Sequence, residues 1–224
     1  LAGGSRIAVL YGVGQILRGS NKMYPLFSSA VLGSDSFSDT LRQVREDESL
    51  KGVIIRVNSP GGDAIASDQI WREMNLLDEV KPVVISMSDT AASGGYYLAM
   101  TGSPILAYPG TYTGSIGVVF GRLNLRELYN KIGVKKEILK RGYFADIDTD
   151  YRPMTPEERE KLRANIEVFY RSFVTKVAEA RNRSWEEIHE IAQGRIWMGS
   201  QAMRNGLVDE IGGFDRAIEM IKRS

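Results

Sequence analysis

Cysteine is absent from this sequence of 224 residues, and histidine occurs only once. The missing thiols exclude disulfides, zinc–thiolate sites and a cysteine nucleophile, and one histidine excludes a multi-histidine metal site within one chain. An excess of one charge is also missing, since 29 lysines and arginines stand against 28 aspartates and glutamates. That balance gives no electrostatic support for a nucleic-acid partner. We therefore expect no metal, no cofactor and no nucleic acid.

Long apolar runs are missing too: no stretch could cross a bilayer, and no signal peptide is visible. The chain opens on Leu1–Ser5 rather than on methionine. We interpret that start as the edge of a processed or excised piece. Any membrane association of the intact protein would then use segments absent from this chain.

Short apolar, β-branched runs alternate with amphipathic helical patterns, which is typical of βα units around a mostly parallel sheet. The stretch 19–35 is polar and rich in glycine and serine, and predicts a loop or flap. Strands are expected at 7–11, 53–57, 83–87, 105–108 and 118–120, with a weaker candidate at 136–140. Helix faces are predicted by Phe37, Leu41 and Val44, and by Ile65, Trp71, Met74 and Leu77.

The last third of the sequence is helical in pattern. A capping box at 155–158 opens a helix to about Arg181, and 184–187 begins the next helix in the same way. Short helices follow at 200–204 and 214–223. We predict an α/β core over 1–154 and a helical C-terminal extension over 155–224. The apolar face of the long helix reads Leu162, Ile166, Phe169, Phe173 and Val177.

Three glycine-rich turns, at 58–62, 91–97 and 113–117, directly follow predicted strands. In a parallel sheet such turns gather at the carboxyl ends of the strands, where ligands bind. Gly61 and Gly62 can adopt positive φ and turn a backbone N–H towards a ligand, although a double glycine also suits an ordinary tight turn. Ser115 offers a hydroxyl in the third turn, which is more often structural than catalytic.

Ser93 lies where the second of these turns passes into a helix that begins near Gly94. The positive end of that helix would favour an anionic intermediate, and the Gly94 N–H could donate to it. Serine is equally common as a simple helix N-cap, and neither role excludes the other.

A serine nucleophile needs a base, and the sequence offers none at a clear position. His189, the sole imidazole, lies on a charged helix face where a solvated role is expected. A Ser-His-Asp triad within the chain is therefore not expected, which leaves a serine–lysine dyad. The lysines nearest the core pattern, Lys131, Lys135, Lys136 and Lys140, have polar or charged neighbours and are expected to be solvated.

The three turns, in their order and spacing, resemble the signal peptide peptidase A family, peptidase family S49. The tail 194–197 with Gly199, Ala202 and 206–209 is also similar to that family, so the likeness covers nearly the whole chain. The resemblance implies a ClpP/crotonase-like spiral core and a ring-forming, membrane-associated peptidase that degrades cleaved signal peptides. The resemblance also implies that this domain lies on the outer or periplasmic side of a bacterial cell membrane.

By this resemblance Ser93 is the nucleophile, and the amides of Gly62 (or Gly61) and Gly94 form the oxyanion hole. Gly61, Gly95, Tyr96 and Ser115 would contact the substrate, with Tyr97, Leu98 and 118–120 extending an apolar groove. The family lysine falls at Ala145. Either the chain is the carboxyl-terminal unit of a long member, whose homologous unit supplies the lysine, or Ala145 replaces the lysine of a single-unit enzyme. We favour the first, and expect the isolated chain to have very low activity.

Two other functions stay open at this stage. The chain could be a non-catalytic unit that only builds a ring, which the missing lysine favours. It could also be a crotonase-type acyl-CoA enzyme, but neither a pocket carboxylate nor a basic patch for the CoA phosphates stands at a motif position. The short peptidases that cut stomatin-like proteins are disfavoured by the helical tail.

Overall fold

The computed structural model describes residues 6–21 and 30–223, and these form two compact units. The first unit comprises Leu1–Gly117 and Ser172–Ser224, and the second comprises Val118–Arg171. The long helix α5 (Pro156–Ala180) runs through the boundary between them. The predicted division at residue 154 follows the sequence pattern alone and stays a prediction.

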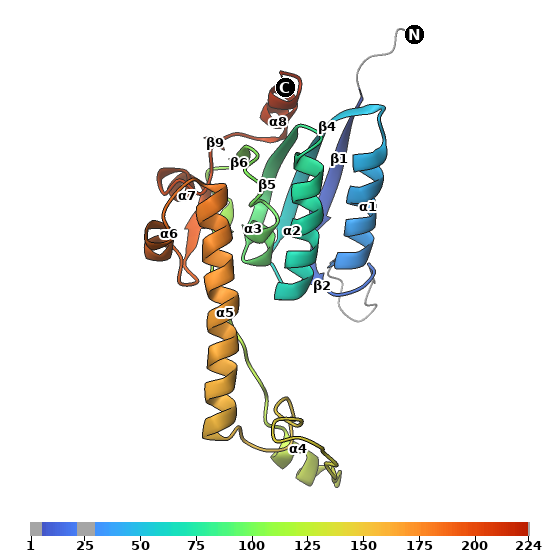
Figure 1. The fold of residues 1–224 in the computed structure, drawn as a ribbon, viewed down its shortest axis with the longest axis vertical. Coiled ribbons are helices and arrows are strands. Elements are labelled where there is room, and N and C mark those ends of the chain that lie inside the picture. The colour runs from blue at the N-terminus through green and yellow to red at the C-terminus, as the bar shows by residue number, and fades with distance from the viewer. Residues whose placement is uncertain (1–5, 22–29, 224) are drawn as a thin grey trace. The chain divides into compact units, whose positions relative to one another are not determined.

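A seven-stranded sheet forms the centre of the first unit (Figure 1). Its main path runs β1–β4–β5–β6–β9, and all of these neighbours are parallel. Strand β7 lies off this path and pairs with β5 in parallel and with β8 in antiparallel orientation. Strands β2 and β3 form a separate parallel pair. The strands are β1 (Arg6–Val13), β2 (Gln15–Leu17), β3 (Val31–Gly33), β4 (Leu50–Ser59), β5 (Val83–Ala92), β6 (Ile105–Ala107), β7 (Tyr112–Gly114), β8 (Ile196–Met198) and β9 (Glu210–Ile211).

Helices cover both faces of this sheet, which confirms the predicted α/β class with a mostly parallel sheet. Figure 1 shows α1 and α2 side by side over one face, and α8 packs on the other. The ClpP/crotonase-like description of the core stays a prediction. The helices are α1 (Ser34–Glu46), α2 (Ala64–Asp78), α3 (Gly94–Tyr97), α4 (Arg126–Lys131), α5, α6 (Trp185–Ile191), α7 (Gly199–Arg204) and α8 (Phe214–Ile221).

The core follows the predicted helix faces in the first unit. Phe37, Leu41 and Val44 of α1 are buried, as are Met74 and Leu77 of α2. Ile65, which we placed on the same face of α2, is instead 48% exposed, because nine residues at 3.6 per turn place it on the side of the helix opposite the buried Met74. The two predicted capping boxes are confirmed, since Thr155 and Glu158 bond reciprocally, as do Ser184 and Glu187.

Three predictions about strands and loops are wrong. Residues 118–120 and 136–140 form no strand, because no described neighbour pairs with them and an isolated run cannot satisfy a β ladder. The predicted loop 19–35 contains strand β3 and the start of α1, whereas its part 22–29 lies outside the described residues.

Candidate active site

The three glycine-rich turns lie at neighbouring strand ends, as the sequence predicts for a parallel sheet. Ser59 at the end of β4 is in register with Ala91 of β5. Ala92, the last residue of β5, is in register with Gly114 of β7. The residues that follow these strands are therefore gathered at one edge of the sheet.

Ser93 occupies a sharp turn between β5 and α3. Its backbone has φ 53° and ψ −120°, a left-handed conformation that costs a non-glycine residue about 1–3 kcal/mol. Two main-chain bonds hold it: its N–H donates to the Gly114 carbonyl at 2.9 Å, and its carbonyl accepts from the Tyr97 N–H at 2.9 Å. Strained residues of this kind persist where the surrounding structure fixes them, often at functional sites.

The Ser93 side chain does not serve as a helix cap, although the residue stands at the N-cap position of α3. A capping serine accepts a hydrogen bond from an N–H of the first turn, and Ser93 accepts none. The residue is partly exposed rather than packed in the interior. Its hydroxyl is therefore left available to another molecule.

The amide of Gly62 is aimed by a neighbouring segment of chain. Ile16 N–H donates to the Gly61 carbonyl at 2.9 Å, and Asp63 N–H donates to the Ile16 carbonyl at 2.9 Å. Because the Gly61–Gly62 peptide is trans, its N–H points opposite to that bonded carbonyl. Strand β2, which contains Ile16, thus sets the direction of the Gly62 N–H.

The amides of Gly62 and Gly94 lie close together. A Cβ atom built on Gly94 would stand 3.1 Å from the Gly62 nitrogen, and one built on Gly61 would stand 2.6 Å from the Gly94 nitrogen. Neither N–H finds an acceptor among the described residues of the chain. Two unpaired backbone donors beside a serine hydroxyl are the elements of an oxyanion hole.

Glycine is required here by close packing. Gly61 has φ 96°, and a Cβ on it would lie 2.9 Å from the Ser93 Cβ. A Cβ on Gly95 would lie 2.4 Å from the Ser59 carbonyl oxygen. The first and second turns are therefore packed backbone against backbone, which fixes the serine relative to the donors.

An ion pair between α5 and α2 bonds to Tyr97, the last residue of α3, and so holds the helix that follows the Ser93 turn. Lys176 of α5 bonds to Asp68 and to the Tyr97 hydroxyl, the latter at 2.8 Å, and Tyr97 donates to Asp68 at 2.6 Å. The Lys176 ammonium also lies 4.2 Å from the Trp71 ring centroid. Partial burial opposes ionisation of Asp68, yet the bonds from Lys176 and Tyr97 hold its pKa below the ordinary value. Burial, followed by the Asp68 carboxylate, raises the pKa of Tyr97.

A second charged group supports the Gly62 side. Asp63 caps α2 by accepting from the Ala66 N–H at 2.9 Å, and the Arg18 Nε lies 3.0 Å from the same carboxylate. Burial opposes ionisation of Asp63, but the Arg18 bond and the cap lower its pKa overall. A cavity of about 480 Å³ lies beside this loop and is lined by Val13, Gly14, Gln15, Ala30, Asn58, Pro60, Gly61 and Gly62.

Two predicted substrate contacts have other surroundings. Tyr96 is fully buried, its hydroxyl donates to the Leu207 carbonyl at 2.8 Å, and burial raises its pKa. Its side chain therefore belongs to the core. Ser115 is partly exposed with φ 49°, and its N–H donates to the Arg195 carbonyl at 2.7 Å.

Ala145 lies in the second unit, in an exposed turn where its N–H donates to the Gly142 carbonyl at 3.3 Å. A methyl group cannot accept a proton, so this position supplies no base. The lysines expected to be solvated, Lys131, Lys135, Lys136 and Lys140, are all exposed. His189 is stacked on Trp185 with ring centroids 4.7 Å apart.

Sequence reasoning missed the groups that position the site. Lys176 lies two residues after the buried pair Phe173 and Val174, on a helix whose apolar spacing alone was used for the prediction. Ile16 acts through its main chain, so its side chain carries no signal for this role. Trp71 was placed on a helix face by its spacing, but its contact with Lys176 of α5 was not predicted.

Comparisons with known proteins give matches to peptidases. The sequence model of peptidase family S49 matches residues 75–224. The chain is 44% identical over 225 residues to a chloroplastic serine protease SPPA of Arabidopsis thaliana and 39% identical over 217 residues to Protease 4 of Salmonella typhi. A putative protease of Methanocaldococcus jannaschii is 35% identical over 223 residues, and the match covers 72% of that protein.

These matches confirm the resemblance: the chain belongs to peptidase family S49. Membership and the protease names of the relatives support a peptidase role. The alignments include 100% and 96% of this chain, but the chain spans only 33% of the Arabidopsis protein and 34% of the Salmonella protein. No described helix is long and apolar enough to cross a membrane.

Proposed function

We propose that this chain is the serine-bearing unit of a serine peptidase, with Ser93 as nucleophile. The observation that carries the proposal is the turn itself. A serine is held at φ 53°, its hydroxyl is not used as a cap, and the unpaired amides of Gly62 and Gly94 lie beside it. A purely structural turn would favour glycine at this position, because glycine adopts positive φ without the strain that serine has.

The chemistry follows from these groups. A neutral amine base removes the Ser93 proton while Oγ forms a bond to the carbonyl carbon of the peptide. The carbonyl oxygen becomes an anion that accepts from the Gly62 and Gly94 N–H groups, each such donor contributing about 3 kcal/mol. The C–N bond then breaks, and the leaving amine takes the proton from the base. Water, activated by the same base, hydrolyses the acyl ester and restores the hydroxyl.

The base comes from outside this chain in our proposal. Ala145 stands where the family lysine is expected, and the chain spans about a third of its long relatives. A homologous unit that bears the lysine would complete the dyad, within a ring of such units at a bacterial membrane. The isolated chain would then bind peptides but cleave them very slowly.

Substrates are proposed to be extended, largely apolar peptides, cleaved signal peptides among them. The cavity next to the Gly61–Gly62 turn supports this, since Val13, Ala30 and Pro60 give it apolar walls. Gly61 and Gly95 are buried against the chain's own backbone, so in this proposal they keep the turn rigid, and Ser115 offers a polar contact at the same strand edge. The Tyr96 side chain has no part in this groove.

The test compares the chain alone with the chain mixed with its lysine-bearing homologous unit. Hydrolysis of a fluorogenic apolar peptide should rise by several orders of magnitude on mixing, and Ser93→Ala should abolish the gain. Ser200→Ala is the matched control, because Ser200 lies far along the chain on α7, where its hydroxyl donates to the Pro109 carbonyl. Activity that survives Ser93→Ala, in a variant with unchanged circular dichroism, would contradict the proposal and favour a ring-building role.

The Ala145→Lys variant separates the two explanations for the missing base. If a homologous unit supplies the lysine, this variant of the isolated chain stays nearly inactive and mixing remains necessary. If Ala145 stands in place of a single-unit lysine, the variant alone should gain hydrolysis that Ser93→Ala removes. An acyl-CoA enzyme would respond to neither change.

A further inference from the structure

Asn58, next to the end of β4, bonds to two other strands beside the Ser93 turn. Its carbonyl accepts from the Gly14 N–H at 3.0 Å, where β1 has just ended. Its side-chain oxygen accepts from the Thr90 N–H at 3.2 Å, and its amide nitrogen donates to the Asp89 carboxylate at 3.3 Å. One residue therefore connects the end of β1, the end of β4 and the last part of β5.

Strand β5 is irregular just before Ser93. Val57 of β4 is in register with Met87, but Ser59 is in register with Ala91. Two steps along β4 thus correspond to four along β5, so β5 has extra residues at this point. Before the irregularity β5 pairs with β6, and after it β5 pairs with β7. A bulge of this kind bends a strand and re-aims the side chains that follow it. The direction in which β5 presents Ser93 is therefore set here.

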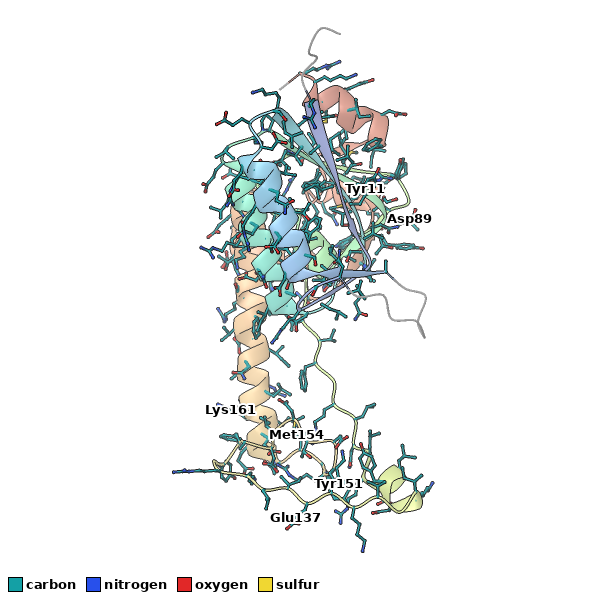
Figure 2. All side chains as sticks on the ribbon, turned by 90° about the vertical axis from the view of Figure 1, so that its right-hand side faces the viewer. Tyr11, Asp89, Glu137, Tyr151, Met154 and Lys161 are labelled. Atoms are coloured by element: carbon teal, nitrogen blue, oxygen red, sulfur yellow. The ribbon has the colours of Figure 1, made fainter. Side chains whose placement is uncertain are left out.

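The Asn58 amide holds the end of this bulge that is nearer to the nucleophile. Thr90 presents an N–H and Asp89 presents a carboxylate, so both contacts require the same orientation of the amide. Figure 2 labels Asp89, which lies on the side of the first unit opposite α1 and α2. The other end of the bulge is held separately, because Arg56 donates to the Ser88 hydroxyl at 3.1 Å. Loss of the amide would therefore release the end that leads into the serine turn.

We propose that Asn58 positions the Ser93 hydroxyl relative to the Gly62 donor. Its side chain fixes the strand that carries the serine. Its main chain holds Gly14, which leads into the segment where Ile16 aims the Gly62 N–H. Nucleophile and donor are thus both located from one residue, which touches no reacting atom and is a positioning residue. The inference rests on the proposed function, because it adds this role to the same site.

The test measures how strongly the chain prefers a tetrahedral anion over an ordinary peptide. The probe is an apolar peptide boronate, and the reference is the carboxamide of the same sequence. Boron accepts an electron pair from the Ser93 oxygen while the hydroxyl proton passes to water, so the complete chain can be tested without a lysine-bearing unit. The wild-type chain should bind the boronate at least about a hundredfold more tightly than the carboxamide. Ser93→Ala should abolish this preference.

Asn58→Asp should lower the preference about tenfold through misplacement of the serine. The new carboxylate still accepts from the Thr90 N–H, but it repels Asp89 where the amide donated. Affinity for the carboxamide should change by less than about threefold, because binding common to both ligands is kept. Asp89→Ala, at an exposed position, should lower the preference about threefold, since it frees one end of the amide.

An exchange of the two side chains gives the sharpest outcome. Asn58→Asp combined with Asp89→Asn keeps the net charge of the chain, and an amide at position 89 can donate to the carboxylate at position 58. This double variant should restore the preference to within about threefold of the wild type. Asn75→Ala is the matched control, because Asn75 lies near the C-terminal end of α2 and its amide donates to the Trp71 carbonyl at 2.8 Å. It should leave the preference unchanged.

Three results would contradict the inference. If the exchange fails to restore the preference, or if carboxamide affinity falls in step with boronate affinity, Asn58 contacts the substrate from the cavity that it lines. If urea unfolding shows lower stability but the preference is unchanged, Asn58 only holds the sheet together. In these cases Ser93→Ala still removes the preference, and the proposed function stands. A preference that survives Ser93→Ala would instead overturn the proposed function, and the role of Asn58 with it.

Discussion

The Ser93 turn and the second unit are built on opposite principles. Around Ser93, glycines touch neighbouring backbone so closely that a methyl group does not fit at Gly61 or Gly95. In the second unit, Gly121 and Gly133 have open space around their Cα atoms, and charged side chains hold the turn near Ala145. The comparison teaches that Ser93, the proposed nucleophile, is positioned by packing, whereas the turn that contains Ala145 is held by ion pairs to the Asp146 carboxylate.

The largest expected effect comes from filling the packed turn. Gly61→Ala should lower the free energy of unfolding by about 3 kcal/mol, because φ is 96° and the new Cβ would stand 2.6 Å from the Gly94 nitrogen. Urea unfolding followed by tryptophan fluorescence measures the change. Gly110→Ala is the control, since nothing lies within 4 Å of its Cβ position, and it should change stability by less than about 1 kcal/mol. Equal effects at both glycines would break the comparison.

A smaller effect is expected from the ion pair behind α3. Asp68→Asn should cost about 1 kcal/mol, because the amide keeps the shape but weakens the bonds from Lys176 and Tyr97. The matched change in the second unit is Glu167→Gln, whose pair with Arg171 is exposed on both sides and contributes less than about 0.5 kcal/mol. Chemical denaturation of both variants gives the difference, and a larger loss at Glu167 would reverse our ranking of the two regions.

Acid should loosen the second unit through Asp146 and Glu158. Hydrogen bonds from Lys140 and Arg152 lower the pKa of Asp146 to about 2, and the bond from Arg152 lowers that of Glu158 to about 2. Because both pKa values are depressed in the folded chain, the stabilisation is complete above the ordinary values, 3.8 for the aspartate and 4.5 for the glutamate, and is lost as pH falls towards 2.

Hydrogen exchange of the amides in 142–158 measures that loss. Exchange should accelerate, relative to the intrinsic rate at each pH, between about pH 4.5 and 2. Arg152→Gln should already exchange fast at neutral pH and lose most of the acid response. An acid response that survives in this variant would mean that other groups hold the turn.

Much of the fold was predictable because its main elements carry local signals. Apolar, β-branched runs predict strands β1, β4, β5 and β6, and a capping box with helical spacing predicts the long helix α5. Strands β2, β3 and β8 are as short as β6 but lack its fully buried apolar run, and their existence depends on the strands with which they pair. Residues 118–120 show the converse, since a β-branched run without a neighbouring strand stays irregular.

The site divides in the same way. Ser93, Gly62 and Gly94 were visible because glycine and serine at strand ends have a local backbone meaning. The anchors were not, because Lys176 reaches α3 from 79 residues away and Ile16 contributes only its main chain. Tyr96 shows why a motif residue need not face the ligand, since it follows the serine turn but points into the core.

The pairing of Ile16 with the Gly61–Asp63 backbone has a consequence for how this protein could lose its chemistry. The donor direction at Gly62 is controlled by a short stretch that contains none of the recognisable motifs. In a homologue with every glycine and the serine intact, shortening residues 14–18 would remove the two bonds that hold this peptide and would turn the Gly62 N–H away from the proposed oxyanion position. A homologue can thus inherit the glycine and serine motifs without the backbone geometry on which the proposed chemistry depends.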